Sequence, residues 1–322
     1  MKNYIVFDLE WNQSPVGKEG TAPGLPFEII EIGAVKLDEN LKQVSEFRRL
    51  IRPVVYDQIH YMISEVIHMD MQELMEQGED FTDAMEEFLE WCGEDYVFCT
   101  WGSMDLTELQ RNMNYFFVEN PFPRPLFYYD VQKLYSLLYR DGKEKHSLEQ
   151  AVEEMGLRGD RAFHQALDDA YYTGCIMTAM DFEKVKVYQS IDYYRPPMNI
   201  EEEIYVEFPN YSKYVSRIFD TKEDAIADKR VTDMVCYRCH RMLRKKIRWF
   251  SVNQKFYFGL AICPQHGLMK GKIRMKKTDD GDVYVVKTQK LVSDEEAKLI
   301  YERKDEAARK RNERNKMRRH KK

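Results

Sequence analysis

The stretch Tyr4-Ile5-Val6-Phe7-Asp8-Leu9-Glu10, near the start of this 322-residue chain, joins a short apolar run to two acids. The β-branched and aromatic residues of the run predict a buried strand. Because side chains alternate along a strand, Asp8 and Glu10 point to one side and Leu9 to the other. Two carboxylates at the end of a buried strand are costly to desolvate unless something positive lies between them. The alternative is two solvated charges where the strand ends.

A third acid follows another apolar run. Tyr96-Val97-Phe98-Cys99 predicts a buried strand, Trp101-Gly102 interrupts it, and Ser103 is placed to cap a helix from Asp105 to Phe117. In α/β sheets, ligands bind at the carboxyl ends of strands, which is where Asp105 lies. The alternative is an ordinary first-turn Asp that favours the helix dipole.

A histidine and a fourth acid share the segment His164-Gln165-Ala166-Leu167-Asp168-Asp169. Small and apolar residues recur at helical spacing after it, so we expect a mostly helical stretch from His164 to Met180. His164 lies at its mobile start, whereas Asp169 is held rigidly inside it. A capping or surface histidine is the alternative. Asp168 lies about 100° around the helix from Asp169, so we expect it outside the direct ligands or in solvent.

The order and spacing of these residues resemble the DnaQ-like exonucleases of the DEDDh type, within the ribonuclease H-like superfamily, over roughly residues 1–182. Asp8-Leu9-Glu10 matches the family's first motif, Asp105 the second, and His164 with Asp169 the third. The run Glu28 to Val35 is similar to the strand that follows the first motif. Relatives of the tyrosine type carry Tyr four residues before the last Asp. Gln165 occupies that position here, which indicates the histidine subtype.

The resemblance leaves the substrate open. The second motif, Cys99 to Leu106, is closer to the branch that trims RNA ends in RNA interference and histone message processing, and to the sporulation-inhibitor KapD proteins. The third motif, Ala166 to Ala170, looks more like the DNA proofreading branch.

The resemblance implies a metal-dependent 3′–5′ exonuclease that releases nucleoside 5′-monophosphates from single-stranded nucleic acid, with RNA slightly favoured over DNA. Two Mg²⁺ or Mn²⁺ ions would stabilise the phosphate oxygens and the leaving oxygen, and such hard cations prefer carboxylate and water ligands. By the resemblance, Asp8 would bridge both ions and Asp105 would support the second. Glu10 and Asp169 would hold the first ion, and His164 would accept the proton of the attacking water. Leu9 and Trp11 would touch the terminal nucleotide.

Two further functions compete with this one. The first is a DNA proofreading-type exonuclease that acts with a polymerase. The second is a non-catalytic nucleic-acid-binding protein built on a nuclease scaffold, and the presence of all five catalytic residue types argues against it.

Two pairs of metal-binding residues lie in the last third of the chain, Cys236-Tyr-Arg-Cys239 and Cys263-Pro-Gln-His266. Three thiolates and an imidazole suit a closed tetrahedral Zn²⁺ site, which leaves no open position for catalysis and would be structural. Hairpin strands between the pairs, Trp249 to Val252 and Phe256 to Phe258, suggest a zinc-ribbon-like module. His240 is the rival fourth ligand, and three reduced cysteines are the alternative.

Positive and negative charges are distributed unevenly along the chain. Residues 231–322 contain 26 Lys and Arg against 11 Asp and Glu, a net charge of +15, so residues 1–230 carry −21 of the formal total of −6. A basic end would concentrate a polyanion near an acidic site that otherwise repels it. This end could also bind structured RNA or a ribosome, or form a solvated helix that frays.

Length and composition limit the remaining choices. The hydrophobic share of 43% supports a real core, and no run approaches the ~20 apolar residues of a membrane span. Six cysteines and a start without a signal-peptide pattern favour a cytoplasmic protein. The oligomeric state is not predicted.

We therefore expect an α/β protein with a ribonuclease H-like mixed five-stranded sheet and helices on both faces, followed by a small β-rich module and a basic helix. The expected divisions are an exonuclease domain at 1–182, a connector at 183–230, a zinc-ribbon-like domain at 231–292 and a basic C-terminal helix at 293–322. Further helices are predicted at 63–75 and 80–91. The many aromatic residues between 115 and 129 are expected mostly in the core.

Overall fold

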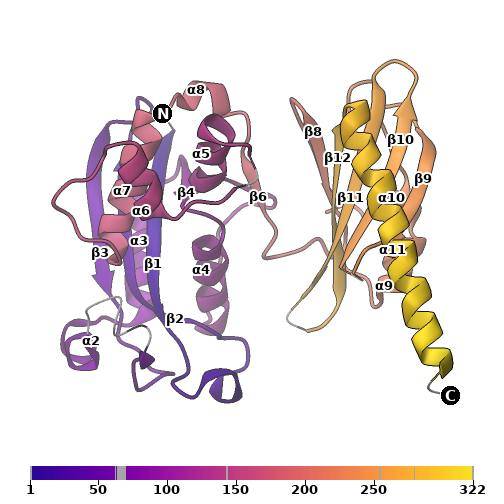
Figure 1. Cartoon of the computed structure of the whole chain (residues 1–322). Coiled ribbons are helices and arrows are strands. Elements are labelled where there is room, and N and C mark those ends of the chain that lie inside the picture. The colour runs from indigo at the N-terminus through magenta and orange to yellow at the C-terminus, as the bar shows by residue number, and fades with distance from the viewer. Residues whose placement is uncertain are drawn as a thin grey trace. The chain divides into compact units, whose positions relative to one another are not determined.

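The computed structural model describes residues 2–61, 63, 70–142, 144–253, 255–278 and 280–320, with side chains as far as residue 313. The chain forms two compact units, Met1–Tyr194 and Arg195–Lys322, each built around its own sheet (Figure 1).

The first unit contains a mixed sheet with the strand order β3-β2-β1-β4-β5-β6. Its strands are β1 (Asn3–Asn12), β2 (Glu28–Leu37), β3 (Gln43–Leu50), β4 (Tyr96–Thr100), β5 (Leu126–Asp130) and β6 (Ser190–Asp192). The central strand β1 pairs antiparallel with β2 and parallel with β4. All five predicted strands are present, and β6 extends the sheet by pairing antiparallel with β5.

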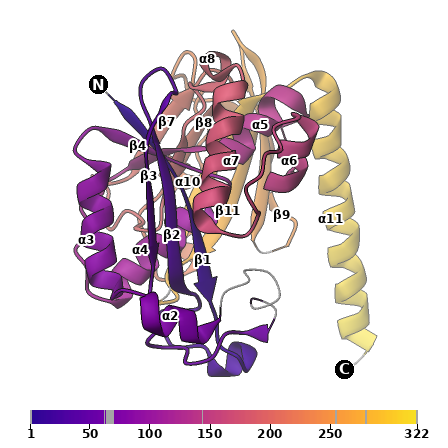
Figure 2. The ribbon, with the colours of Figure 1, turned by 90° about the vertical axis from the view of Figure 1, so that its left-hand side faces the viewer.

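Helices cover both faces of this sheet, as expected. Figure 2 shows α3 and α4 on one side and α5, α6 and α7 on the other. The helical elements are the 3-10 turn η1 (Gly17–Gly20), α2 (Met71–Gln77), α3 (Phe81–Cys92), α4 (Met104–Tyr115), α5 (Val131–Tyr139), α6 (Leu148–Glu154), α7 (Ala166–Ala179) and α8 (Phe182–Val185).

Strand alternation in β1 divides the core of the first unit into two layers. Phe7 and Leu9 pack in the layer that includes α3 and α4, whereas Val6 packs in the layer that includes α5, α6 and α7. Asp8 and Glu10 share the parity of Val6, so they lie on the α7 face of the sheet.

Small residues allow α7 to approach β2 closely. Ala166, Ala170 and Gly174 recur every fourth residue on the buried face of α7. A Cβ atom built on Gly174 would lie 3.2 Å from the Val35 side chain, and one built on Gly33 would overlap the start of α7. The carboxyl half of β1 is therefore close to the first turn of α7.

Local hydrogen bonds fix the ends of several elements in the first unit. Ser147 and Gln150 form the capping box that opens α6. Strands β2 and β3 are antiparallel neighbours, and the Asp38 side chain in their turn accepts hydrogen bonds from the N–H groups of Asn40 and Lys42.

Other local predictions need correction. Ser103 occupies the N-cap position of α4, but its side chain makes no capping hydrogen bond. Of the helix expected at 63–75, Ile63 is helical, Asp70 is not and caps the separate helix α2, and residues 62 and 64–69 lie outside the described residues. His164 lies two residues before α7 and has a φ of +65°, so it is not helical.

The aromatic residues after α4 are mostly core, as expected. Phe122, Tyr128 and Tyr129 are each at most 6% exposed. Phe117 is the exception: it is 95% exposed and has a φ of +58°.

The second unit is larger than the predicted module. Its six-stranded sheet has the order β7-β8-β12-β11-β10-β9, and every neighbouring pair is antiparallel. The strands are β7 (Ile204–Phe208), β8 (Tyr211–Val215), β9 (Arg244–Ser251), β10 (Phe256–Cys263), β11 (Gly267–Lys277) and β12 (Val283–Leu291). The helices are α9 (Lys222–Ala227), α10 (Lys229–Thr232) and α11 (Asp294–His320).

Helices lie on both faces of the second sheet. Ala225 of α9 and Val231 of α10 pack with Ile273 of β11. Ala297 and Ile300 of α11 pack with residues of β9 and β10 on the opposite face. The predicted hairpin after residue 249 is the β9–β10 pair.

The predicted connector at 183–230 is therefore not a separate element. Its first part completes the first unit with α8 and β6, and the rest supplies β7, β8, α9 and the start of α10 to the second unit. The segment at 231–292 is not an independent domain either, since its strands share a sheet with β7 and β8. Strands β7 and β8 are only five residues long each, and β8 pairs with the distant β12, so local sequence did not reveal this pairing.

The long C-terminal helix is confirmed as α11. Its start is capped by Ser293, whose hydroxyl accepts a hydrogen bond from the N–H of Glu296. Among the helices that the structure describes, none combines the length and the apolar composition needed to span a membrane.

Candidate functional site

Three carboxylates converge at the carboxyl half of β1. Asp8, Glu10 and Asp169, which we call the acidic cluster, each place an oxygen within 4.8 Å of an oxygen of the other two. Asp8 and Glu10 come from one face of β1, and Asp169 comes from the first turn of α7. The predicted convergence of residues 161 positions apart is confirmed by this geometry.

Gly33 of β2 allows α7 to reach this position. A Cβ atom on Gly33 would lie 2.0 Å from the backbone N of Leu167 and 2.1 Å from the carbonyl carbon of Ala166. Real Cβ atoms do not make such contacts, so any larger residue would displace the helix that carries Asp169.

Glu31 also fixes the start of α7. Its side chain is fully buried opposite Glu10 in the β1–β2 pair, and its Oε2 accepts a hydrogen bond from the N–H of Ala166 at 3.3 Å. Its other oxygen accepts a hydrogen bond from Arg48 Nε at 2.6 Å. Glu31 thus holds the helix against the sheet and adds a negative charge behind the acidic cluster.

Sequence reasoning did not single out Gly33 or Glu31. The signal for Glu31 was an acid inside the otherwise apolar run of β2, where an unpaired charge would be costly. The signal for Gly33 was a glycine in the interior of the same strand, which often marks close approach of another backbone.

Asp105 lies beside the cluster at the start of α4. It is 5% exposed, and its carboxylate accepts a hydrogen bond from the N–H of Leu9. Its charge raises the pKa of Asp8 and of Glu10, which places it within electrostatic reach of both. Asp105 does not belong to the three carboxylates whose oxygens lie within 4.8 Å of one another.

Burial and crowding shift the pKa values of all four acids upward. Burial, followed by repulsion from Asp105 and Asp169, raises the pKa of Asp8 well above its usual range. Burial and then the charge of Asp169 raise the pKa of Glu10 to about 8. Burial is also the largest cause for Asp105 and Asp169, whose pKa values rise to about 7. Without a positive partner, the protein cannot keep these groups ionised at little cost.

The residues fit divalent cations. No described Lys or Arg forms an ion pair with the acidic cluster, and Arg48 is paired with Glu31 instead. Oδ1 of Asp169 is buried and accepts no hydrogen bond within the described structure. A set of clustered carboxylate oxygens is the donor set that Mg²⁺ and Mn²⁺ prefer.

His164 is tied to the cluster through its backbone. Its N–H donates to Oδ2 of Asp169 at 3.3 Å, while its side chain is exposed. The positive φ of +65° turns the chain sharply before α7. The imidazole therefore lies at the open edge of the site, as expected for a residue approaching from outside the helix.

The Asp168 side chain is not placed to act as a metal ligand. Arg161 Nη1 lies 3.2 Å from its Oδ1, and the same arginine pairs with Glu46. Asp168 is therefore occupied by a cation of the protein itself, in agreement with its position around the helix.

The two residues expected to touch the terminal nucleotide, Leu9 and Trp11, differ in how much of each is exposed. The Leu9 side chain is 3% exposed and lies in the core, so only the backbone of this residue is able to reach the site. Trp11 follows an irregularity in the β1–β2 pairing and is half-buried, with its ring centroid 5.6 Å from that of Phe27.

A second cluster lies in the second unit. Cys236, Cys239, Cys263 and His266, which we call the Cys/His cluster, each place a ligand atom within 4.8 Å of the others. Cys236 and Cys239 precede β9, Cys263 is the last residue of β10, and His266 lies in the turn between β10 and β11.

The distances within the Cys/His cluster fit a tetrahedral metal. Cys239 Sγ and Cys263 Sγ lie 3.6 Å apart, and His266 Nδ1 lies 3.4 Å from Cys236 Sγ and 3.6 Å from Cys263 Sγ. Tetrahedral Zn²⁺ with Zn–S bonds of about 2.3 Å places sulfur ligands roughly 3.7 Å apart. Hydrogen bonds from the N–H groups of Gln265 and His266 contribute to lowering the pKa of Cys263 to about 6, although burial opposes them.

His240 is not part of this cluster. Its Nδ1 lies 3.3 Å from Glu207 Oε1, and its φ is +55°. Of the two histidines weighed as the fourth ligand, the geometry therefore favours His266.

Comparison with known proteins agrees with this picture. The model of the family described as Exonuclease matches residues 5–177, which is more than half of the chain. No curated protein matches the sequence.

Several nucleases are among the solved structures similar to this chain. The nuclease domain of 3′hExo, a DEDDh family member bound to rAMP, is 20% identical, with 59% of this chain and 96% of that chain covered at a TM-score of 0.49. Exonuclease I is 13% identical, with 81% of this chain and 55% of that chain covered at a TM-score of 0.50. The Mg²⁺- and Mn²⁺-bound form of S. pombe Pop2p is 18% identical, with 57% of this chain and 83% of that chain covered at a TM-score of 0.41. The likeness to exonuclease I supports the fold alone.

Proposed function

Since the chain belongs to the exonuclease family whose model matches residues 5–177, we propose that it is a 3′–5′ exonuclease that acts on single-stranded nucleic acid and prefers RNA to DNA. The exonuclease activity itself follows from the family. The direction, the strand preference and the choice of RNA are proposals.

One observation carries the proposed mechanism. The carboxylates of Asp8, Glu10 and Asp169 meet within 4.8 Å without any described lysine or arginine to neutralise them. We assign Mg²⁺ or Mn²⁺ to this cluster, with Asp105 supporting a second cation from the start of α4. When bound, two such cations stabilise charge on the attacking and leaving oxygens.

The protein's own groups complete the reaction. Water attacks the terminal phosphorus, the bond from phosphorus to the 3′ oxygen of the preceding nucleotide breaks, and that oxygen takes up a proton. We assign His164 to accept the proton of the attacking water, because its imidazole lies at the exposed edge beside Asp169. The products are a nucleoside 5′-monophosphate and a strand shorter by one nucleotide with a free 3′ hydroxyl.

Trp11 and the backbone of Leu9 are assigned to the terminal nucleotide. Trp11 lies at the end of β1, directly after Glu10, and its half-buried side chain packs against the core layer that contains Leu9. Aromatic rings that remain partly exposed stack with bases irrespective of sequence.

The Cys/His cluster is proposed as a structural Zn²⁺ site. Four protein ligands at tetrahedral spacing leave no position for substrate, and they connect the loop before β9 with the β10–β11 turn. Purified protein should contain one zinc per chain. Cys263→Ser and His266→Ala should lose it, whereas His240→Ala should retain it. Full zinc content in the His266 variant would contradict the assignment.

The function is tested by following product release from strands labelled at the 3′ end. Mononucleotides should be released with Mn²⁺, release should stop with EDTA, and single-stranded RNA should react faster than DNA of the same sequence. Faster hydrolysis of DNA would favour the proofreading alternative. Binding without any hydrolysis would favour a nuclease scaffold that only binds nucleic acid.

A further inference from the structure

One face of the second sheet carries basic and aromatic side chains beside α11. Strand alternation places the even-numbered residues of β10 and β11 on this face, because Leu260 and its pairing partner Lys270 lie on the side that packs against α11. The group, which we call the cationic groove, consists of Phe256, Phe258, Lys270, Lys272, Arg274 and Arg303.

Each cation of this group lies over an aromatic ring. Lys272 Nζ is 4.8 Å from the ring centroid of Phe256, and Arg274 is 5.9 Å from the same centroid. Arg303 of α11 and Lys270 lie 5.2 Å and 5.6 Å from the Phe258 centroid. The rings therefore hold the positive charges in a defined arrangement.

Three of these cations form no ion pair in the described structure. No described carboxylate lies within ion-pair distance of Lys272, Arg274 or Arg303, whereas Arg217, Lys245 and Lys310 of the same unit form ion pairs. Burial and the charges of Arg274 and Arg303 lower the pKa of Lys272. Cations that repel one another in a fixed arrangement are stabilised by an anion that binds among them.

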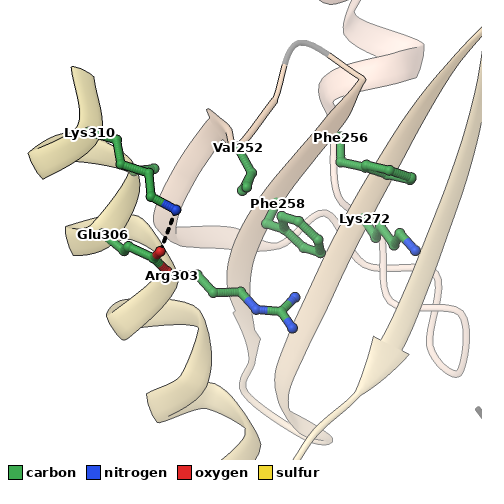
Figure 3. A pocket seen from close by; sticks show the side chains of 8 residues that line it. Val252, Phe256, Phe258, Lys272, Arg303, Glu306 and Lys310 are labelled. Atoms are coloured by element: carbon green, nitrogen blue, oxygen red, sulfur yellow. Dashed lines mark ion pairs between the residues drawn. The ribbon is translucent and has the colours of Figure 1, made fainter. Parts of the chain in front are cut away.

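A hollow between the strands and α11 gives access to these side chains. It has a volume of about 300 Å³, at the lower end of the range for ligand sites. Figure 3 shows Arg303 extending from α11 toward the strands beside Phe258, with Phe256 and Lys272 farther along. The Lys310–Glu306 ion pair borders the hollow, so Lys310 is already neutralised.

We propose that the cationic groove binds single-stranded nucleic acid, with phosphates on Lys272, Arg274 and Arg303 and a base stacked on the half-buried ring of Phe256. Grooves that combine positive charge with aromatic platforms bind single strands in this way. The inference rests on the proposed function, because it assigns to the second unit a share in holding that enzyme's substrate. It places this contact on β10, β11 and Arg303 of α11, and not on the basic end of that helix.

The proposal is tested by measuring the binding of 5′-fluorescein-labelled U20 and dT20 to the full-length protein. Divalent cations are left out so that the strands are not hydrolysed. The Lys272→Glu/Arg303→Glu double variant should bind both more than tenfold more weakly. The matched control is Lys222→Glu/Lys229→Glu, which makes the same change in charge on α9 and α10, on the opposite face of the sheet. This control should bind within about twofold of wild type.

Two further variants distinguish the contribution of charge to binding from that of base stacking, and both from a loss of binding caused by misfolding. Lys272→Ala/Arg303→Ala should reduce the slope of log affinity against log salt by roughly 1.4, since each phosphate contact of a single strand contributes about 0.7. Phe256→Leu keeps an apolar side chain but removes the ring, and it should weaken binding about fivefold. Both should keep the zinc content and the circular dichroism spectrum of wild type. A 20-base-pair duplex should compete poorly, and equal competition would overturn the stacking role.

Hydrolysis by the same variants distinguishes the groove from the nuclease site. The groove predicts a raised KM for U20 with kcat unchanged in the Lys272→Glu/Arg303→Glu variant. Wild-type binding and KM in that variant would overturn the groove and leave the exonuclease assignment intact. Absence of hydrolysis by the wild type would instead overturn the proposed function, whether or not the groove binds.

Discussion

The backbone N–H of His164 donates a hydrogen bond to Oδ2 of Asp169 at 3.3 Å, although His164 lies outside α7 and Asp169 lies in its first turn. The residue proposed as the base and a residue proposed as a metal ligand are therefore joined through the main chain. The His164 side chain is exposed and free to be replaced without loss of this bond.

The His164→Asn variant tests the role of the imidazole separately from that of the backbone hydrogen bond. Asparagine tolerates the positive φ of this position better than alanine, so the hydrogen bond to Asp169 should persist. We expect kcat to fall on the order of 10²- to 10⁴-fold, which is the usual contribution of a general base, with Mn²⁺ affinity within about twofold of wild type. Single-turnover rates and Mn²⁺ titration measure the two effects. Wild-type kcat in this variant would remove His164 from the mechanism.

Gly33→Ala tests the close contact between β2 and α7. The added Cβ would overlap Ala166 and Leu167, so the start of α7 must move. We expect a loss of about 1–3 kcal/mol in the free energy of unfolding and a fall in activity on the order of 10²-fold, since displacement of about 1 Å disturbs a catalytic site that strongly.

The matched control for this change is Gly159→Ala. A Cβ atom there would meet nothing closer than the Tyr172 hydroxyl at 3.8 Å. Denaturant unfolding and mononucleotide release should both stay near wild type in the control. Equal effects at the two glycines would argue against a special role for the β2–α7 contact.

Glu31→Ala tests the buried acid behind the cluster. The substitution leaves the Ala166 N–H without its acceptor and Arg48 without its partner. We expect a loss of roughly 1–3 kcal/mol in the free energy of unfolding. Glu46 lies in the neighbouring strand β3, and Glu46→Ala, which breaks its exposed pair with Arg161, should cost less than about 1 kcal/mol. Chemical denaturation compares them, and a cost for Glu31→Ala no larger than for Glu46→Ala would count against the bracing role of Glu31.

Cation binding should depend on pH. In the metal-free protein the pKa of Glu10 is raised to about 8 and that of Asp169 to about 7, chiefly by burial. The native state therefore binds more protons than the unfolded chain between about pH 4 and pH 8. Its metal-free stability should fall as pH rises through that window, and Mn²⁺ should displace protons when it binds.

Calorimetric titration of the zinc-loaded protein with Mn²⁺ at pH 7, in buffers of different ionisation enthalpy, measures the released protons. We expect roughly one or more protons per protein and an affinity that rises about tenfold between pH 6 and pH 7. Asp169→Asn should release fewer. An affinity independent of pH would mean that the cation binds elsewhere.

The sequence predicted those parts of the site that depend on local periodicity. Alternation along β1 was sufficient to place Asp8 and Glu10 on one face, and helical spacing was sufficient to place Asp169 inside α7 and Asp168 away from it. The position of His164 was not predictable in the same way. It has a positive φ just before the start of α7, which packs closely on β2, and helical periodicity does not register where such a turn occurs.

Long-range pairing was the other limit. Glu31 is informative only once its partners Ala166 and Arg48 are known, and neither is close to it in sequence. Strand β8 pairs with β12 across about 70 residues and β7 pairs only with β8, so the segment before residue 231 could not be assigned to the second sheet from its own composition. The Cys/His cluster was predictable because its two pairs have the spacing that a metal site requires.

The most direct test of the account is the rate of 5′-mononucleotide release with Mn²⁺ by Asp8→Asn and Asp169→Asn, beside the matched Asp168→Asn. All three remove one carboxylate charge, but Asp168 is paired with Arg161 and lies outside the acidic cluster. We predict that the rates of the first two fall on the order of 10³-fold or more, equivalent to about 4 kcal/mol of transition-state stabilisation, and that Asp168→Asn stays within about threefold of wild type. Undiminished release by Asp8→Asn or Asp169→Asn would contradict the assignment of the acidic cluster as the catalytic centre.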